Sequence, residues 1–516
     1  MKPLEQRSYN YIALILVVSA TVLYCLNLGG WLINDDEGTS LYAAWRLSEG
    51  DLPHRDFASE HSPFFAYLGS GLIQVFGPSI IALRCSSAIL TLSAALTIFL
   101  VTKKAWGQRA AFLATLFMLL NLEVFLQGRV FRTDTYTLFF TAAGLCALIA
   151  SQSRNQRGYL YLAGCLMGLG TLVKVIGVLP ALGGGLFLLS RLWQERRNWR
   201  LPVLDLMAYV LPYMALLGAG YGLYLIISSD LITNLAGAQG TLGRGIRLHT
   251  LLKKGALFLT SYFRANLTLL LAIPAAVSII KRRDRTGMIL IWQLPTALIV
   301  MLMRGPQFSR YFLYLAPTWS LLLAHSVEAF FRWCESVPNE GEDLPWLQRG
   351  IFMVYRAYKR TGLEKAFVIL VALLVASPWI IPVARTSMGR ESATLRLAEY
   401  ITELTEPDDH IVTDYASLNF HSQREGVYQT DIISWGHAAA GVLLGSDLIK
   451  EIEAKSVKLI AIHVGDNSGG AHFAAMHDFE EFYQYVRDHY VLVGEFDRLY
   501  QTFEIYLAED RLSNVQ

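Results

Sequence analysis

Residues 8–34 contain no Asp, Glu, Lys or Arg. A helix needs about 20 consecutive apolar residues to cross the hydrocarbon core of a bilayer, so this run is long enough to span. The whole chain is 53% hydrophobic and only 17% charged, whereas soluble proteins carry about 25% charged residues. The sequence therefore predicts a mainly α-helical, polytopic membrane protein.

Apolar stretches of spanning length recur along the first 383 residues, and we expect eleven transmembrane helices. They lie near residues 10–30, 80–102, 109–127, 134–150, 158–173, 175–190, 203–228, 255–280, 286–303, 310–331 and 365–383. The N-terminal run is too long for a cleaved signal and lacks a small-residue cleavage site, so it is expected to remain as the first span.

Basic clusters fix the expected orientation, since loops rich in Lys and Arg stay in the cytoplasm. All of these clusters fall on one side if residues 158–173 and 175–190 form a hairpin that turns at Lys174. Lys174 then lies near the outer surface. The N-terminus is expected inside and the C-terminal part outside the plasma membrane, which we take to be a bacterial inner membrane.

The tail differs from the rest of the chain in charge. From Ala384 to the end there are 10 Lys and Arg against 22 Asp and Glu, a net of −12 in a chain whose total is +2. This predicts two parts: a membrane domain at 1–383 and a small exoplasmic α/β domain at 384–516. Helices are expected at 391–405 and 476–490, strands at 410–413 and 457–463, and a β-hairpin at 491–508.

The five cysteines, Cys25, Cys85, Cys146, Cys165 and Cys334, avoid the tail and the expected outer loops. No disulfide framework is therefore indicated.

The first outer loop, 30–79, is long enough to hold structure of its own. Apolar residues at helical spacing predict a helix at 37–49. A second helix is expected to start at Ser62 and Pro63 and to stop at Gly77. Both are too short to span comfortably, so they are expected to lie in the membrane interface.

Four groups of polar residues converge on the outer face in this topology. They are Asp35, Asp36 and Glu37; Glu60 and His61; Arg129, Arg132 and Asp134; and the cations Lys174, Arg244, Arg247, Arg304 and Arg310. Sugar transfer from a polyprenyl phosphate needs such a set. A carboxylate takes the proton of the attacking acceptor, and cations neutralise the departing phosphate. Direct displacement with one base predicts inversion at the anomeric carbon.

Four segments resemble motifs of membrane glycosyltransferases of the GT-C type, in particular protein O-mannosyltransferases and bacterial aminoarabinose transferases acting on lipid A. Residues 35–42 (DDEGTSLY) resemble the Asp-Glu signature of their first outer loop, and residues 60–63 (EHSP) its acidic-X-X-Pro element. Residues 168–174 (GLGTLVK) and 310–317 (RYFLYLAP) are similar to their later Lys and Arg-Tyr motifs.

The resemblance implies roles for individual residues. Asp36 would be the base or orient the acceptor, with Glu37 supporting it, and Glu60 would contact the donor sugar or the acceptor. Lys174 and Arg310 would hold the lipid phosphate. Further substrate-binding candidates are His61, Arg129, Arg132, Asp134 and Tyr311. The implied partners are a polyprenyl-phosphate sugar, an acceptor lipid, glycan or protein, and membrane lipid, with no nucleic acid.

Other interpretations stay open at this point. The acidic cluster after the first span could merely stop one helix and cap the next, and Lys174 or Arg310 could anchor helices at the interface. The resemblance implies no cofactor and no catalytic metal, although four carboxylates leave a divalent metal as an alternative. A lipid-linked oligosaccharide flippase, another transporter, or a non-catalytic glycolipid-binding subunit would also suit a membrane protein of this kind.

Overall fold

The structure is a computed structural model of the chain. It describes residues 16–30, 35–59, 62–154, 156–195, 199–228, 269–302, 309–336, 393–431, 438–439, 441, 443–464, 472–498 and 501–515. The expected span at 365–383 and much of that at 255–280 lie outside these residues, as do Glu60, His61, Arg244, Arg247 and Arg304.

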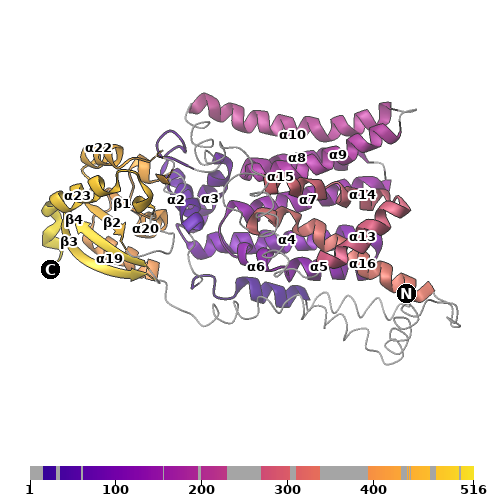
Figure 1. The fold of residues 1–516 in the computed structure, drawn as a ribbon, viewed down its shortest axis with the longest axis horizontal. Helices are drawn as coiled ribbons and strands as arrows, with labels where there is room; N and C mark the ends of the chain where they lie inside the picture. The colour runs from indigo at the N-terminus through magenta and orange to yellow at the C-terminus, as the bar shows by residue number, and fades with distance from the viewer. Residues whose placement is uncertain are drawn as a thin grey trace.

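Long helices form the first part of the chain and lie side by side in Figure 1. After the helix Leu16–Cys25 come α2 (Asp35–Glu49), α3 (Pro63–Phe76), α4 (Ile80–Trp106), α5 (Gln108–Leu119), α6 (Leu122–Gln127), α7 (Thr133–Arg154), α8 (Arg157–Val173), η1 (Val175–Gly177), α9 (Val178–Gln194) and α10 (Arg200–Ile227). Then follow α13 (Leu269–Arg282), α14 (Arg285–Ile291), α15 (Leu294–Leu302), η4 (Ser309–Leu315) and α16 (Ala316–Ser336).

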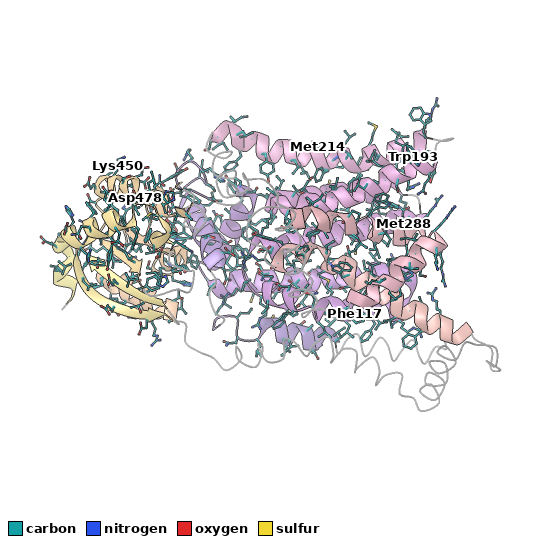
Figure 2. All side chains as sticks on the ribbon, in the orientation of Figure 1. Phe117, Trp193, Met214, Met288, Lys450 and Asp478 are labelled. Atoms are coloured by element: carbon teal, nitrogen blue, oxygen red, sulfur yellow. The ribbon has the colours of Figure 1, made fainter. Side chains whose placement is uncertain are left out.

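Within the described residues, four helical stretches are long and apolar enough to cross a bilayer: Ile80–Trp106, Thr133–Gln152, Val175–Gln194 and Arg200–Ile227. The outermost is α10, whose Met214 is 55% exposed, whereas Phe117 on α5 is 3% exposed inside the bundle (Figure 2). Apolar side chains exposed along a long helix are what a lipid-facing surface requires. The chain is thus a multi-pass membrane protein, while the full count of eleven spans stays a prediction.

The hairpin predicted at Lys174 is confirmed by a shared ion pair at its far end. Asp205 on α10 accepts from Arg157 Nε at 3.1 Å and from Arg191 Nη1 at 3.3 Å. Arg157 begins α8 and Arg191 lies in the last turn of α9. The two helices therefore run in opposite directions and bring their basic ends together.

Two of the predicted spans each form two shorter helices in the structure. The stretch 109–127 forms α5 and α6 because Asn121 caps α6: its side chain accepts from the backbone N–H groups of Glu123 and Val124. The stretch 286–303 is likewise divided at Trp292, where α14 ends. In the first outer loop, α2 starts two residues before its predicted position, and α3 ends at Gly77, whose φ of 73° favours glycine.

The tail forms a four-stranded sheet with helices around it. Its elements are α19 (Ala393–Leu404), β1 (Ile411–Thr413), α20 (Ala416–Ser422), η6 (Tyr428–Thr430), α22 (Gly445–Lys455), β2 (Leu459–His463), η7 (Phe473–Ala475), α23 (Phe479–His489), β3 (Val491–Arg498), β4 (Gln501–Leu507) and η8 (Glu509–Val515). The strand order is β1-β2-β4-β3, with β1 and β2 parallel and the other neighbours antiparallel. The strands β3 and β4 pair where the sequence predicts a hairpin.

The tail packs on the first outer loop, at one end of the bundle (Figure 1). At Gly38 of α2, an added Cβ would lie 2.8 Å from the backbone nitrogen of Ser417 on α20. Gly426 N–H donates to the hydroxyl of Tyr42 at 2.8 Å, and Arg46 lies 3.5 Å from Glu425. The basic ends of α8 and α9 lie at the opposite end of the bundle.

Candidate active site

A single carboxylate, that of Asp36, lies between two guanidinium groups at the start of α2. Arg132, in the link between α6 and α7, donates from Nη2 to Asp36 Oδ2 at 2.6 Å. Arg310 Nη1, from η4, lies 2.9 Å from the same oxygen. The Asp36 side chain is 36% exposed and that of Arg132 only 5%, so the carboxylate remains accessible while the guanidinium behind it is fixed.

A second carboxylate continues this arrangement. Lys174 Nζ donates to Asp134 Oδ1 at 2.8 Å, and Arg132 Nη2 lies 3.5 Å from Asp134 Oδ2. Arg132 therefore links both carboxylates. Lys174 lies between the end of α8 and the start of η1. Its backbone is extended, with φ of −149° and ψ of 130°, so its side chain does not follow the face of either helix.

The five side chains of this cluster, which we call the rim cluster, are Asp36, Arg132, Asp134, Lys174 and Arg310. Three are cations and two are carboxylates, so the rim cluster carries one excess positive charge. Burial raises the pKa of Asp36. The positive charges of Arg132, Arg310 and Lys174 together lower this pKa by more than burial raises it, so that it lies below the ordinary value of an aspartate. Asp36 is therefore ionised at neutral pH, and the site as a whole suits an added anion.

Tyr311 lies beside two cations of the rim cluster. Its ring centre is 5.9 Å from Lys174 Nζ and 5.9 Å from the guanidinium carbon of Arg310. These separations are at the outer limit of cation–π attraction. Tyr311, which is a binding candidate from the motif at residues 310–317, therefore borders the rim cluster.

Glu37, the neighbour of Asp36, faces away from the rim cluster and into the protein. Its carboxylate accepts from Arg84 Nε at 2.8 Å and Nη2 at 2.6 Å, and from the backbone N–H of Phe131 at 2.8 Å. Both Glu37 and Arg84 are fully buried. Glu37 thus ties α2 to α4 and to the link that carries Arg132, and its supporting role beside Asp36 stays a prediction.

Arg129 contacts α6 and the residue that follows the first helix. Its guanidinium donates to the backbone carbonyl of Leu26 and lies 5.1 Å from the ring centre of Phe125. Arg129 is thus packed toward the end of the first helix, and its role in binding substrate stays a prediction. No sequence motif indicates Arg84. It lies within a long apolar stretch, and its partner Glu37 is 47 positions away in the chain.

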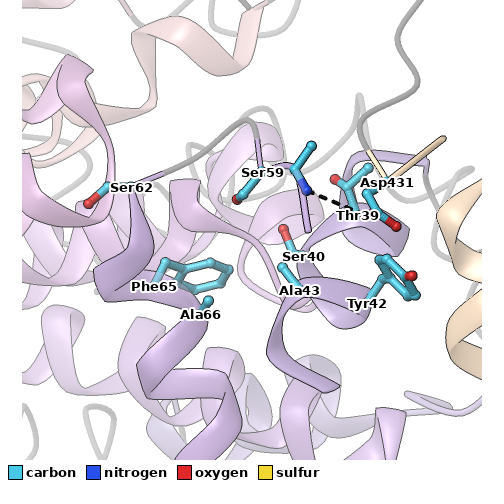
Figure 3. Close-up of a pocket in the computed structure, with 10 residues that line it drawn as sticks. Thr39, Ser40, Tyr42, Ala43, Ser59, Ser62, Phe65, Ala66 and Asp431 are labelled. Atoms are coloured by element: carbon cyan, nitrogen blue, oxygen red, sulfur yellow. Dashed lines mark hydrogen bonds between the residues drawn. The ribbon is translucent and has the colours of Figure 1, made fainter. Parts of the chain in front are cut away.

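A small pocket lies between the first outer loop and the tail (Figure 3). Its lining comprises Thr39, Ser40, Tyr42, Ala43, Ala58, Ser59, Ser62, Phe65, Ala66 and Asp431. Asp431 follows η6 in the tail, and its Oδ2 accepts from the backbone N–H of Ala58 at 3.3 Å. The sequence does not indicate Asp431, because nothing in the tail resembles a catalytic motif.

Within the described part of the chain, no group of three or more His, Cys, Asp or Glu side chains is arranged to hold a metal ion. Asp36 and Asp134 are each paired with cations instead. The side chain of Asp35, together with Glu60 and His61, lies outside the residues that the structure describes.

Residues 60–229 match the family model described as dolichyl-phosphate-mannose-protein mannosyltransferase. This stretch includes Arg132, Asp134 and Lys174 of the rim cluster. A comparison with curated proteins found no significant match in sequence.

Solved structures share the fold over nearly the whole chain. ArnT from Cupriavidus metallidurans bound to undecaprenyl phosphate is 14% identical, with a TM-score of 0.62 and 98% of each chain covered. The oligosaccharyltransferase of Archaeoglobus fulgidus is 15% identical, with a TM-score of 0.55, covering 88% of this chain and 70% of its own. The resemblance to GT-C membrane glycosyltransferases, predicted from four short motifs, is confirmed at the level of the fold.

Proposed function

We propose that this protein transfers a sugar from a polyprenyl phosphate to an acceptor at the outer face of the plasma membrane. The observation that carries the proposal is the position of Asp36, a partly exposed carboxylate held against Arg132 and Arg310 in a cluster with one excess positive charge. A base beside a phosphate-binding set of cations is what this reaction requires.

The similar structures support the class of donor. One carries undecaprenyl phosphate, and another, the archaeal oligosaccharyltransferase AglB, is in complex with an inhibitory peptide and a dolichol phosphate. Both lipids present a phosphate on an isoprenoid chain. We infer that the rim cluster of this chain binds the same kind of headgroup, with Arg310 and Lys174 on the phosphate oxygens.

In the proposed reaction an acceptor oxygen attacks the anomeric carbon of the sugar. The bond between that carbon and the phosphate oxygen breaks, and its electron pair leaves with the polyprenyl phosphate. The acceptor proton passes to Asp36, while Lys174 and Arg310 neutralise the charge that develops on the phosphate. One displacement inverts the anomeric carbon, and Glu37 contributes by holding α2 and the Arg132 link in place.

The arrangement favours an enzyme over the rival transporter. Transporters of the inverted-repeat kind place their ionisable binding groups near the middle of the membrane, on broken helices. Here Asp36 of the rim cluster lies in the first turn of α2, the helix on which α20 of the tail packs. Groups at that level are suited to chemistry on a headgroup that projects from the bilayer.

The decisive experiment is sugar transfer by the purified protein. The protein is incubated with a panel of radiolabelled undecaprenyl-phosphate pentoses and hexoses and with a membrane extract as acceptor. We expect label to move from the lipid donor to a new product. If label instead stays on the donor and crosses the bilayer of proteoliposomes, the protein is a flippase.

A further inference from the structure

One side of α2 faces the tail. Gly38, Tyr42 and Arg46 follow one another at intervals of four residues, so they lie on one stripe of the helix. An added Cβ at Gly38 would lie 2.7 Å from the Cβ of Ser417 on α20. Further along the stripe, Arg46 lies 3.5 Å from Glu425. Figure 1 shows α2 between the tail and the other helices. The tail therefore contacts α2 near its start and again about two turns later.

The hydroxyl of Tyr42 is the centre of this interface. It accepts from the backbone N–H of Gly426 at 2.8 Å and from Arg46 Nη1 at 2.8 Å. It also donates to the carboxyl group of Asp431. Tyr42 is 1% exposed, and removing one partner of a buried hydrogen bond leaves the other group unsatisfied. A single phenol group thus joins α2 to two residues of the tail.

Asp36 leaves α2 on the side away from the tail. It precedes Gly38 by two residues, which is about 200° around the helix axis. On that side its carboxylate meets Arg132 Nη2 at 2.6 Å and Arg310 Nη1 at 2.9 Å. The tail therefore holds the back of the helix whose opposite side carries the proposed base.

Glu37 alone cannot fix the direction of α2. It binds Arg84 and lies next to Asp36 in the chain, so it fixes one point near the start of the helix. At 1.5 Å per residue, Tyr42 and Arg46 lie about 9 Å and about 15 Å from Asp36 along the axis. Contacts at that distance stop the helix from tilting about the Glu37 contact. Such a tilt would move Asp36 relative to the rest of the rim cluster.

We propose that the tail positions the base of the reaction: by binding Tyr42 and Arg46 it sets the tilt of α2, and thereby the place of Asp36 in the rim cluster. Tyr42 is a positioning residue, since it is buried and acts through Asp36. The inference rests on the proposed function and gives the tail a part in it. A displacement of about 1 Å from the productive geometry can cost about 100-fold in rate, so a small tilt is enough to slow transfer.

Tyr42→Phe tests this proposal by removing the hydroxyl and keeping the ring. The matched control is Tyr490→Phe, which removes a hydrogen bond to the backbone carbonyl of Val457 inside the tail. For Tyr42→Phe we expect kcat to fall by about 10-fold to about 100-fold. Binding of sugar-free undecaprenyl phosphate should stay unchanged, because Lys174 and Arg310 lie outside α2. Tyr490→Phe should match the wild type in both measurements.

The pH dependence of transfer reports where Asp36 lies. Burial raises the pKa of this carboxylate, and the charge of Asp134 raises it as well. Arg132, Arg310 and Lys174 together lower the pKa below its ordinary value. A tilt of α2 away from these cations raises the pKa. Because only the ionised form accepts the proton, the acidic limb of kcat against pH should move to higher pH in the variant. A variant that merely loses folded protein would lower kcat and the capacity to bind lipid together and leave the limb in place, and that result would overturn the proposal.

Hydrogen exchange tests the hold on α2 without any sugar transfer. In Tyr42→Phe, amides 35–41 should exchange about tenfold faster than in the wild type, the effect of one hydrogen bond to a charged group, while α7 and α8 should exchange as before. Equal exchange in α2 overturns the proposal. If the wild type transfers sugar from no donor, the proposed function fails, and hydrogen exchange still decides whether the tail holds α2. If Tyr42→Phe does not fold, Gly38→Ala, which widens the same interface, takes its place in each measurement.

Discussion

Arg310 Nη1 lies 2.9 Å from Asp36 Oδ2 and thereby joins η4 to the first turn of α2. The same carboxylate oxygen accepts from Arg132 at 2.6 Å. A carboxylate held by two cations is a weak base, because both guanidinium groups favour its ionised form. Asp36 is thereby held in the ionised form, which is the form that can accept a proton.

Replacing Asp36 by Asn should abolish sugar transfer and leave the fold intact. General-base catalysis contributes about 10²–10⁴-fold, so we expect kcat to fall by at least 100-fold. The measurement is transfer of radiolabel by purified protein, with thermal unfolding as the check on folding. Asp56→Asn, at a carboxylate of the same outer loop paired with Arg55, is the control. Undiminished transfer by Asp36→Asn would remove this residue from the role of base.

Replacing Lys174 or Arg310 by Gln should weaken binding of the lipid donor more than binding of the acceptor. Each substitution removes a charge-assisted hydrogen bond to phosphate, worth roughly tenfold to a hundredfold in affinity. Binding of sugar-free undecaprenyl phosphate and the KM for acceptor are measured in parallel. Equal effects on the two substrates would argue against phosphate recognition by these cations.

Breaking the Glu37–Arg84 ion pair should lower the stability of the fold, and any loss of sugar transfer should follow from that loss of stability. Both side chains are fully buried, and removal of one partner from a buried ion pair costs about 3–5 kcal/mol. We expect Glu37→Gln and Arg84→Met each to lower the unfolding temperature in detergent. The double variant Glu37→Leu with Arg84→Met should recover part of the loss, since no unpaired charge remains. A Glu37→Gln protein of normal stability without activity would instead indicate direct participation in the reaction.

Adding a methyl group at Gly38 should loosen the contact between α2 and the tail. The new Cβ would lie 2.7 Å from Ser417 Cβ and 2.8 Å from its backbone nitrogen, and backbone cannot move aside as a flexible side chain can. We expect Gly38→Ala to release a C-terminal fragment faster under limited proteolysis. Gly71→Ala in α3, where nothing lies within 4 Å, should be neutral or stabilising by up to about 1 kcal/mol.

Asp431 should make stability depend on pH. Burial raises its pKa to about 7, although Arg46 and the nearby Tyr42 hydroxyl lower it. The folded state then holds this proton more tightly than the unfolded state, so the stability it provides is present below about pH 4 and declines as pH rises to about 7. The total change is on the order of a few kcal/mol. Unfolding temperatures across this range should fall less steeply for Asp431→Asn, and an identical slope for both proteins would contradict the assignment.

Features that depend on neighbours along the chain could be predicted from the sequence. The charge-free run at 8–34, the turn at Lys174 and the end of α3 at Gly77 follow from local composition and backbone preference. Asp36, Lys174 and Arg310 could be named in advance because their segments resemble motifs of GT-C glycosyltransferases. The break at Asn121 was missed, since a capping side chain inside an apolar stretch is a weak signal.

The sequence by itself determined that the chain enters a membrane and which polar residues it carries at the ends of its helices. Only the tertiary structure decided what these residues do. Asp36 and Glu37 are adjacent, yet the helix rotates by about 100° between them, so one is partly exposed and the other is buried. Their partners Arg132 and Arg84 lie 96 and 47 positions away. Such pairings arise from the packing of helices, which no local pattern of residues contains.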